Sequence, residues 1–144
     1  MTREGLRKRL RGLFRALLLR APGPTSHEPD PVEAEREHRL AWAAACAQAE
    51  AAIAAVVRET VPEVRLFSLH TPVGTPPVIA VWIVTETDEE RDLLRADPAL
   101  QPKLARLFRA TPFPGGARPA PAFALESEET VAREHGGNWW TVVK

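Results

Sequence analysis

The chain has 144 residues, of which 44% are hydrophobic, and its 19 basic and 19 acidic side chains cancel. This length suits one ordinary globular domain and is too short for two. The balanced charge argues against a basic nucleic-acid-binding body, and the single cysteine excludes a disulfide framework or a multi-thiolate zinc site within one chain.

Residues 1–20 predict a basic amphipathic helix with a net charge of +6, which the rest of the chain offsets. Its apolar face is formed by Leu6, Leu10, Leu13, Phe14 and Leu17. Its basic flanks are formed by Arg7, Lys8, Arg11 and Arg15. Three interpretations remain open. The leucines pack on the rest of the chain or on a second copy, giving a homodimer, or the basic residues contact an anionic membrane or nucleic-acid phosphates, or the segment is a frayed terminus.

The proline-rich segment 21–29 predicts a linker, which leaves residues 30–144 as a single domain. The longest apolar run of the first helix, Ala16 to Leu19, is far short of the roughly 20 residues that cross a bilayer, and no secretory cleavage pattern follows it. We therefore expect neither a transmembrane helix nor a signal peptide, and a cytoplasmic location. Arginine outnumbers lysine 16 to 3, which is typical of GC-rich bacterial coding.

The next segments alternate between helix and strand signals. Asp30, followed by Pro31 and Glu33, predicts the start of a helix that runs to about Thr60. Two β-rich segments follow at 64–69 and 78–84, and the second is apolar throughout, which predicts a central strand covered on both faces. Two shorter helices are expected at about 88–96 and 98–110, the first capped by Thr87.

The last third predicts a loop at 111–121, a strand at 122–126, a helix between Ser127 and Gly136, and a final strand at 139–143. The whole order predicts an α+β fold in which a four-stranded, largely antiparallel sheet packs with helices and is preceded by two N-terminal helices.

Groups able to bind metal or transfer protons are densest at Glu126, Glu128, Glu129, Glu134 and His135. The spacing of a zinc-hydrolase helix or a calcium loop is missing, and charge placement at helix ends explains the cluster more simply. Cys46 and Ser127 lack the neighbours of a catalytic nucleophile, and no phosphate-binding glycine motif occurs. We therefore predict no catalytic residue, metal or cofactor. A hydrolase using His70 or His135 with a glutamate is the less favoured alternative.

The adjacent tryptophans Trp139 and Trp140 carry the functional hypothesis. Neighbouring residues of a strand point to opposite faces, so we expect one indole to face outward beside Asn138 unless both faces are covered. The alternative is that the N-terminal or the alanine-rich helix covers it. The residues expected to bind a protein partner are Glu126, Glu128, Glu129, Asn138, Trp139 and Trp140. The sequence thus favours a non-catalytic interaction module of the inhibitor or adaptor type, with a membrane or nucleic-acid adaptor tethered by residues 1–20 as the alternative.

Overall fold

The computed structural model describes residue 28, residues 30–71 and residues 76–143, apart from the side chains of residues 70 and 71. Its internal contacts divide the chain into Met1–Glu33 and Ala34–Lys144. The predicted helix 1–20 and most of the predicted linker lie outside the described residues. The helices are α2 (Pro31–Val57), α3 (Asp88–Arg95), α4 (Leu100–Ala110) and α5 (Glu128–His135), and the strands are β1 (Arg65–Thr71), β2 (Val78–Thr85) and β3 (Ala120–Ser127).

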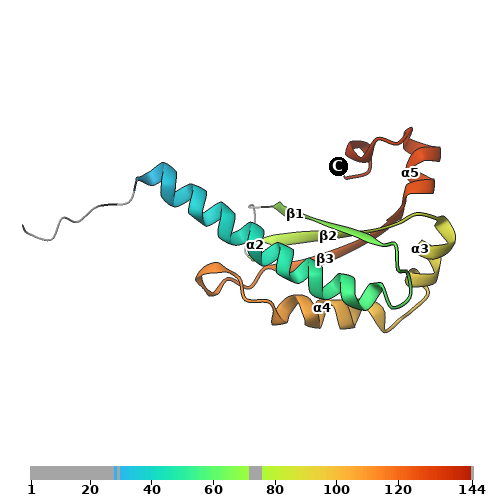
Figure 1. Ribbon diagram of the computed structural model, residues 1–144, viewed down its shortest axis with the longest axis horizontal. Coiled ribbons are helices and arrows are strands. Elements are labelled where there is room, and N and C mark those ends of the chain that lie inside the picture. Colours follow the sequence, from blue (N-terminus) through green and yellow to red (C-terminus); the bar gives the residue numbers. More distant parts are fainter. Residues whose placement is uncertain (1–27, 29, 72–75, 144) are drawn as a thin grey trace, which may run out of the picture. The chain divides into compact units, whose positions relative to one another are not determined.

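The described part of the chain is an α+β fold with four helices and a three-stranded mixed sheet (Figure 1). The strand order is β1-β2-β3, with β1 antiparallel and β3 parallel to β2. The prediction of a largely antiparallel, four-stranded sheet was therefore wrong in both direction and number. Because α3 and α4 carry the chain back to the starting end of β2, β3 leaves that end in the same direction as β2.

The C-terminal segment, which was predicted as the fourth strand, instead forms a 3-10 turn, η2, at Trp139–Thr141. The Asn138 carboxamide oxygen accepts a hydrogen bond from the backbone N–H of Trp140 at 3.0 Å, and the N–H of Thr141 donates to the Asn138 carbonyl at 3.2 Å. These local bonds compete with a strand ladder, as asparagine side chains commonly do. The β-rich composition of this segment was therefore a misleading signal.

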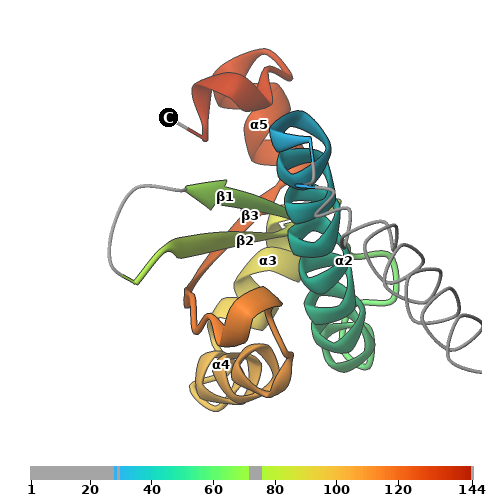
Figure 2. The ribbon, with the colours of Figure 1, turned by 90° about the vertical axis from the view of Figure 1, so that its left-hand side faces the viewer.

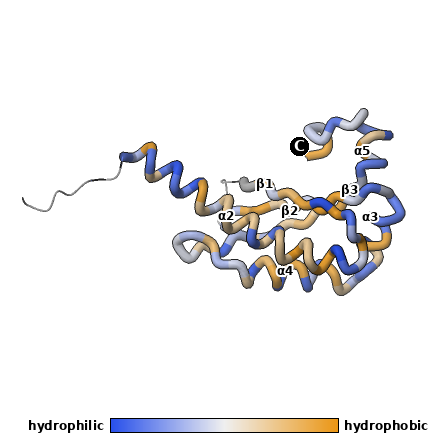
Figure 3. The backbone as a smooth tube through the Cα atoms, viewed as in Figure 1, coloured by the Kyte–Doolittle hydropathy of each residue, from blue (hydrophilic) through white to orange (hydrophobic). Residues whose placement is uncertain are grey.

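The core lies on one face of the sheet, against α2 and α4 (Figure 2). Strand β2 contributes Ile79, Val81 and Ile83, which are fully buried. Helix α4 contributes Leu104 and Phe108, each 1% exposed. Figure 3 shows hydrophobic residues concentrated along β2 and in the second half of α2.

The prediction that β2 is central is confirmed, but its two faces differ. On the face opposite the core, Val78 is 38% exposed, and Ala80 and Trp82 are half-buried. We expected both faces to be fully covered, and that was wrong. On this second face, Trp139 of η2 packs against Phe67 of β1 and Trp82 of β2.

Helix α2 is long and apolar enough, by length and composition alone, to cross a membrane. A helix that packs in the core of a domain can meet the same criterion of length and composition. Its buried residues are Trp42, Ala45, Ala49, Ile53, Ala54 and Val57. Most of them belong to the core cluster shared with β2 and α4, and 39% of the apolar window of α2 is buried.

Several helix ends agree with the predictions from sequence, whereas α4 begins without a side-chain cap. The Asp30 carboxylate accepts from the N–H of Val32 at 3.0 Å, and Thr87 and Glu90 form the reciprocal capping box of α3. Helix α5 ends at Gly136, whose φ of 58° lies in the left-handed region that favours glycine.

Candidate functional site

The two neighbouring tryptophans of η2 have opposite surroundings. The Trp139 ring meets the rings of Phe67 and Trp82 edge-on, with centroids 5.9 and 6.3 Å away, on the sheet face opposite the core. Trp140 is 79% exposed, and no other large hydrophobic side chain that the structure describes is as open to solvent. The packing of Trp139 thus fixes the backbone next to the exposed Trp140 indole.

Glu128, the first residue of α5, joins this turn to the rest of the fold. Its carboxylate accepts a hydrogen bond from the indole N–H of Trp139 at 3.3 Å and forms an ion pair with Arg65 of β1. The C-terminal turn is therefore attached both to the sheet and to the acidic first turn of α5. In Figure 1, α5 and this turn lie on the side of the sheet away from α4.

A second polar cluster lies where β2 and β3 lead into α3 and α5, and we name it the Asp88 cluster. The hydroxyls of Ser127 and Thr130 both donate to Asp88 Oδ1, the second at 2.6 Å. Arg133 donates to Asp88 Oδ2 at 3.0 Å, and Arg91 donates to Oδ1 at 3.1 Å. The Asp88 carboxylate is thus held by one residue of its own helix and by three residues from the end of β3 and from α5.

This surrounding lowers the pKa of the Asp88 carboxyl far below its ordinary value. The largest cause is the hydrogen bond from Ser127, followed by that from Thr130, and both favour the charged form. The same contacts raise the pKa of Arg133 further, chiefly through its hydrogen bond to Asp88. The donors to Asp88 come from α3, from the end of β3 and from α5. The cluster therefore connects α5 to α3.

We expect Asp88→Asn to lower the free energy of unfolding at neutral pH. A carboxyl whose pKa is lowered in the folded state stabilises the fold above its unfolded pKa, near 3.8, and loses that contribution as the pH falls below it. The difference between wild type and variant should therefore be constant from pH 8 to about 6 and shrink below about pH 4. Urea denaturation at a series of pH values measures it.

Glu89→Gln is the matched control, because it removes one carboxylate from the same first turn of α3. Glu89 is exposed, and among the described residues its side chain makes no hydrogen bond. An Asp88→Asn protein whose unfolding free energy tracks that of Glu89→Gln at every pH would show that the Asp88 cluster does not stabilise the fold.

The structure separates the six residues expected to bind a partner. Glu128, Asn138, Trp139 and Trp140 come together at the C-terminal turn. Glu126 instead faces the Asp88 cluster, where it pairs with Arg91 at 3.0 Å.

Glu129 is exposed, and one of its carboxylate oxygens accepts from the N–H of Asp88 at 2.9 Å. Sequence reasoning missed the role of Asp88, because the capping signal around Thr87 marks a helix start and says nothing of contacts with α5.

The remaining sequence candidates fall elsewhere. Arg7, Lys8, Arg11 and Arg15 lie outside the described residues, as does the side chain of His70. The ring Nδ1 of His135 lies 3.0 Å from the hydroxyl of Thr141. Within the described ranges, no group of three acidic, histidine or cysteine residues is arranged to hold a metal ion.

The cavities on the described surface include two of similar volume. One, of about 670 Å³, lies between α2 and β1 and is lined in part by Trp42, Cys46, Glu50 and Ser68. Burial, with a smaller contribution from Glu50, raises the pKa of the Cys46 thiol, which favours the unreactive protonated form. The other, of about 650 Å³, lies at the end of α4 and is lined in part by basic residues.

Comparisons of the chain with protein-family models, with curated proteins and with solved structures found no match. The fold and the site define an α+β domain with a three-stranded mixed sheet that presents one anchored and one exposed indole at its C-terminal turn. The function is therefore inferred from these contacts.

Proposed function

We propose that this chain is a non-catalytic interaction module that binds a protein partner through the C-terminal turn and the first turn of α5. The observation that carries the proposal is the 79% exposure of Trp140 next to the anchored Trp139. Large exposed aromatic residues are enriched among those that dominate binding energy at protein interfaces. A fixed backbone around such a residue also lowers the entropy lost on binding.

The charges beside the turn indicate what the partner carries. Glu128 has a side chain 38% exposed, and Glu129 is exposed at the same helix start. A partner segment that places an arginine or lysine beside an apolar side chain matches these features, because a cation is attracted both by carboxylates and by the face of an indole.

Trp140→Ala tests the proposal by removing the exposed ring. We expect the partner recovered by the wild-type chain to bind this variant at least about tenfold more weakly, the loss typical of a central interface aromatic. Partners are first captured with the immobilised wild-type chain and identified. The dissociation constant of each purified partner is then measured by calorimetry against wild type and variant.

Leu93→Ala is the control, since Leu93 is a large hydrophobic residue on α3 that is 55% exposed and is not among the residues assigned to the partner surface. Its affinity for the partner should equal that of wild type. Equal affinity of all three proteins, or a wild-type chain that binds no protein, would contradict the proposal.

A further inference from the structure

The cavity at the end of α4 has an aromatic and proline-rich wall. Phe108 and Phe113 lie behind its surface, with ring centroids 5.3 Å apart and exposures of only 1% and 7%. The accessible apolar surface includes Pro112 and Pro121, whereas Pro119 is buried. Proline fixes its own φ, so this wall is held in shape before any ligand arrives. The volume of about 650 Å³ lies within the range typical of small-molecule sites.

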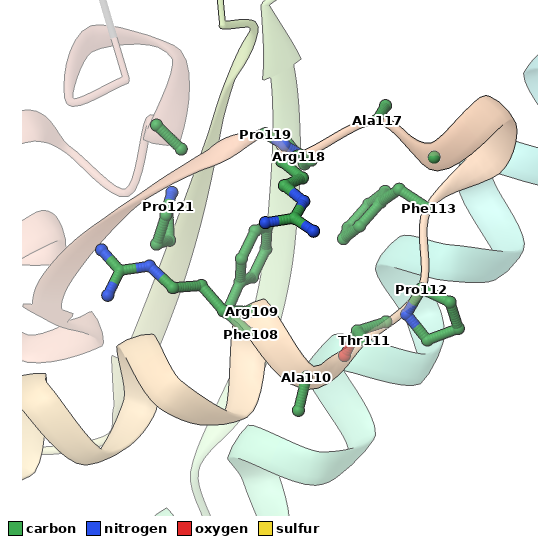
Figure 4. A pocket seen from close by; sticks show the side chains of 12 residues that line it. Phe108, Arg109, Ala110, Thr111, Pro112, Phe113, Ala117, Arg118, Pro119 and Pro121 are labelled. Carbon is green, nitrogen blue, oxygen red and sulfur yellow. The ribbon is translucent and has the colours of Figure 1, made fainter.

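Two cations line the same cavity. Arg109 comes from the last turn of α4, and Arg118 comes from the extended segment before β3. In Figure 4 the Arg118 side chain is drawn in front of the region of Phe108 and Phe113, whereas that of Arg109 extends toward Pro121, and both arginines are exposed. The cavity is therefore apolar in its wall and positive at its opening.

Neither cation is neutralised by the described part of the chain. Among the described residues, Arg109 and Arg118 make no hydrogen bond or ion pair, and the cavity lining holds no aspartate or glutamate. The negative end of the α4 dipole accounts for a basic residue at Arg109, but it does not account for Arg118. Two unpaired guanidinium groups beside an apolar cavity provide ten N–H donors for an anion.

We propose that this cavity binds a small organic anion, in which a planar apolar ring lies against the accessible proline surface of Pro112 and Pro121 and a carboxylate or phosphate meets the two arginines. Arginine suits such a head group because its planar fork matches carboxylate and phosphate oxygens. The ring supplies apolar burial against the proline surface, which an inorganic anion would lack.

The cavity is separate from the partner surface. Ala120, the first residue of β3, lines the cavity, and Ser127 at the other end of β3 begins α5. The seven residue steps between them span roughly 23 Å. The two sites can therefore be tested independently.

Naphthoate serves as the probe, with naphthalenemethanol as the neutral analogue and acetate as the anion without a ring. Titration of the full chain is followed by amide NMR, which reports both the dissociation constant and the residues affected. We expect saturable binding of naphthoate with shifts centred on Phe113 and Ala117, and much weaker binding of the other two compounds.

Arg118→Gln should weaken naphthoate binding by about tenfold or more, because it removes charge-assisted hydrogen bonds. Arg118 is exposed and unpaired among the described residues, so the variant keeps the fold, and its unperturbed amide spectrum verifies this. Arg106→Gln is the control, since it removes the same charge from the exposed side of α4, outside the cavity lining.

Three outcomes would overturn the proposal. Naphthoate does not bind, naphthalenemethanol binds as tightly as naphthoate, or Arg106→Gln weakens binding as much as Arg118→Gln does. The last result would show that general attraction to a basic surface explains the binding.

Discussion

Phe108→Ala is expected to lower the free energy of unfolding by about 3–5 kcal/mol. Phe108 is 1% exposed, and its ring lies 5.3 Å from that of Phe113, which in turn lies 5.3 Å from Trp42 of α2. Removing the Phe108 ring takes away the contact that connects α4 to the rings of Phe113 and Trp42. It also leaves a void that the proline-rich loop cannot easily fill, because its prolines restrict backbone adjustment.

Urea denaturation followed by circular dichroism measures this loss. A domain of this size is stable by about 5–15 kcal/mol, so the variant should unfold at a much lower urea concentration. Leu93→Ala, an exposed position, should stay within about 0.5 kcal/mol of wild type. A Phe108→Ala protein within about 1 kcal/mol of wild type would show that α4 does not depend on this ring.

Trp139→Ala is expected to lower the free energy of unfolding by about 2–3 kcal/mol, less than for a fully buried tryptophan because Trp139 is half-buried. The variant loses the edge-on contacts with Phe67 and Trp82 and the hydrogen bond to Glu128. The rings of Phe67 and Trp82 then face water.

Trp140→Ala is the matched control, because it deletes the same side chain one residue further along the chain. Trp140 is 79% exposed, so its loss should change the unfolding free energy by less than about 0.5 kcal/mol. Equal destabilisation by the two substitutions would mean that Trp139 does not anchor the turn. The pair also separates folding from binding, since Trp140→Ala is expected to weaken partner binding alone.

Much of the fold was predictable because its signals are local. Proline positions, capping side chains and apolar residues at helical spacing placed every described helix within a few residues, and the central position of β2 followed from its apolar run. The pairing direction of β3 was harder to predict from the sequence. Strand composition does not encode direction, which depends on where two intervening helices deliver the chain.

The candidate site was predictable in part. Tryptophan pairs are rare enough to draw attention, and one of the two indoles is exposed, as expected. The reason given from sequence, alternation along a strand, was wrong, since η2 is a turn. Glu126 was grouped with the partner surface because it is close in sequence, whereas a strand end and a helix start direct it to Arg91.

The sequence by itself determined where helices begin and end, since Thr87, Ser127 and Gly136 act on backbone groups only a few residues away. Only the tertiary structure decided that Asp88 binds α5 and that Trp139 binds the sheet. Both contacts exist because Thr85 and Ser127 lie side by side in parallel strands and Phe67 and Trp82 lie side by side in antiparallel ones. Partners separated by 40 or more residues are selected by the free energy of the whole packed fold, which no local pattern records.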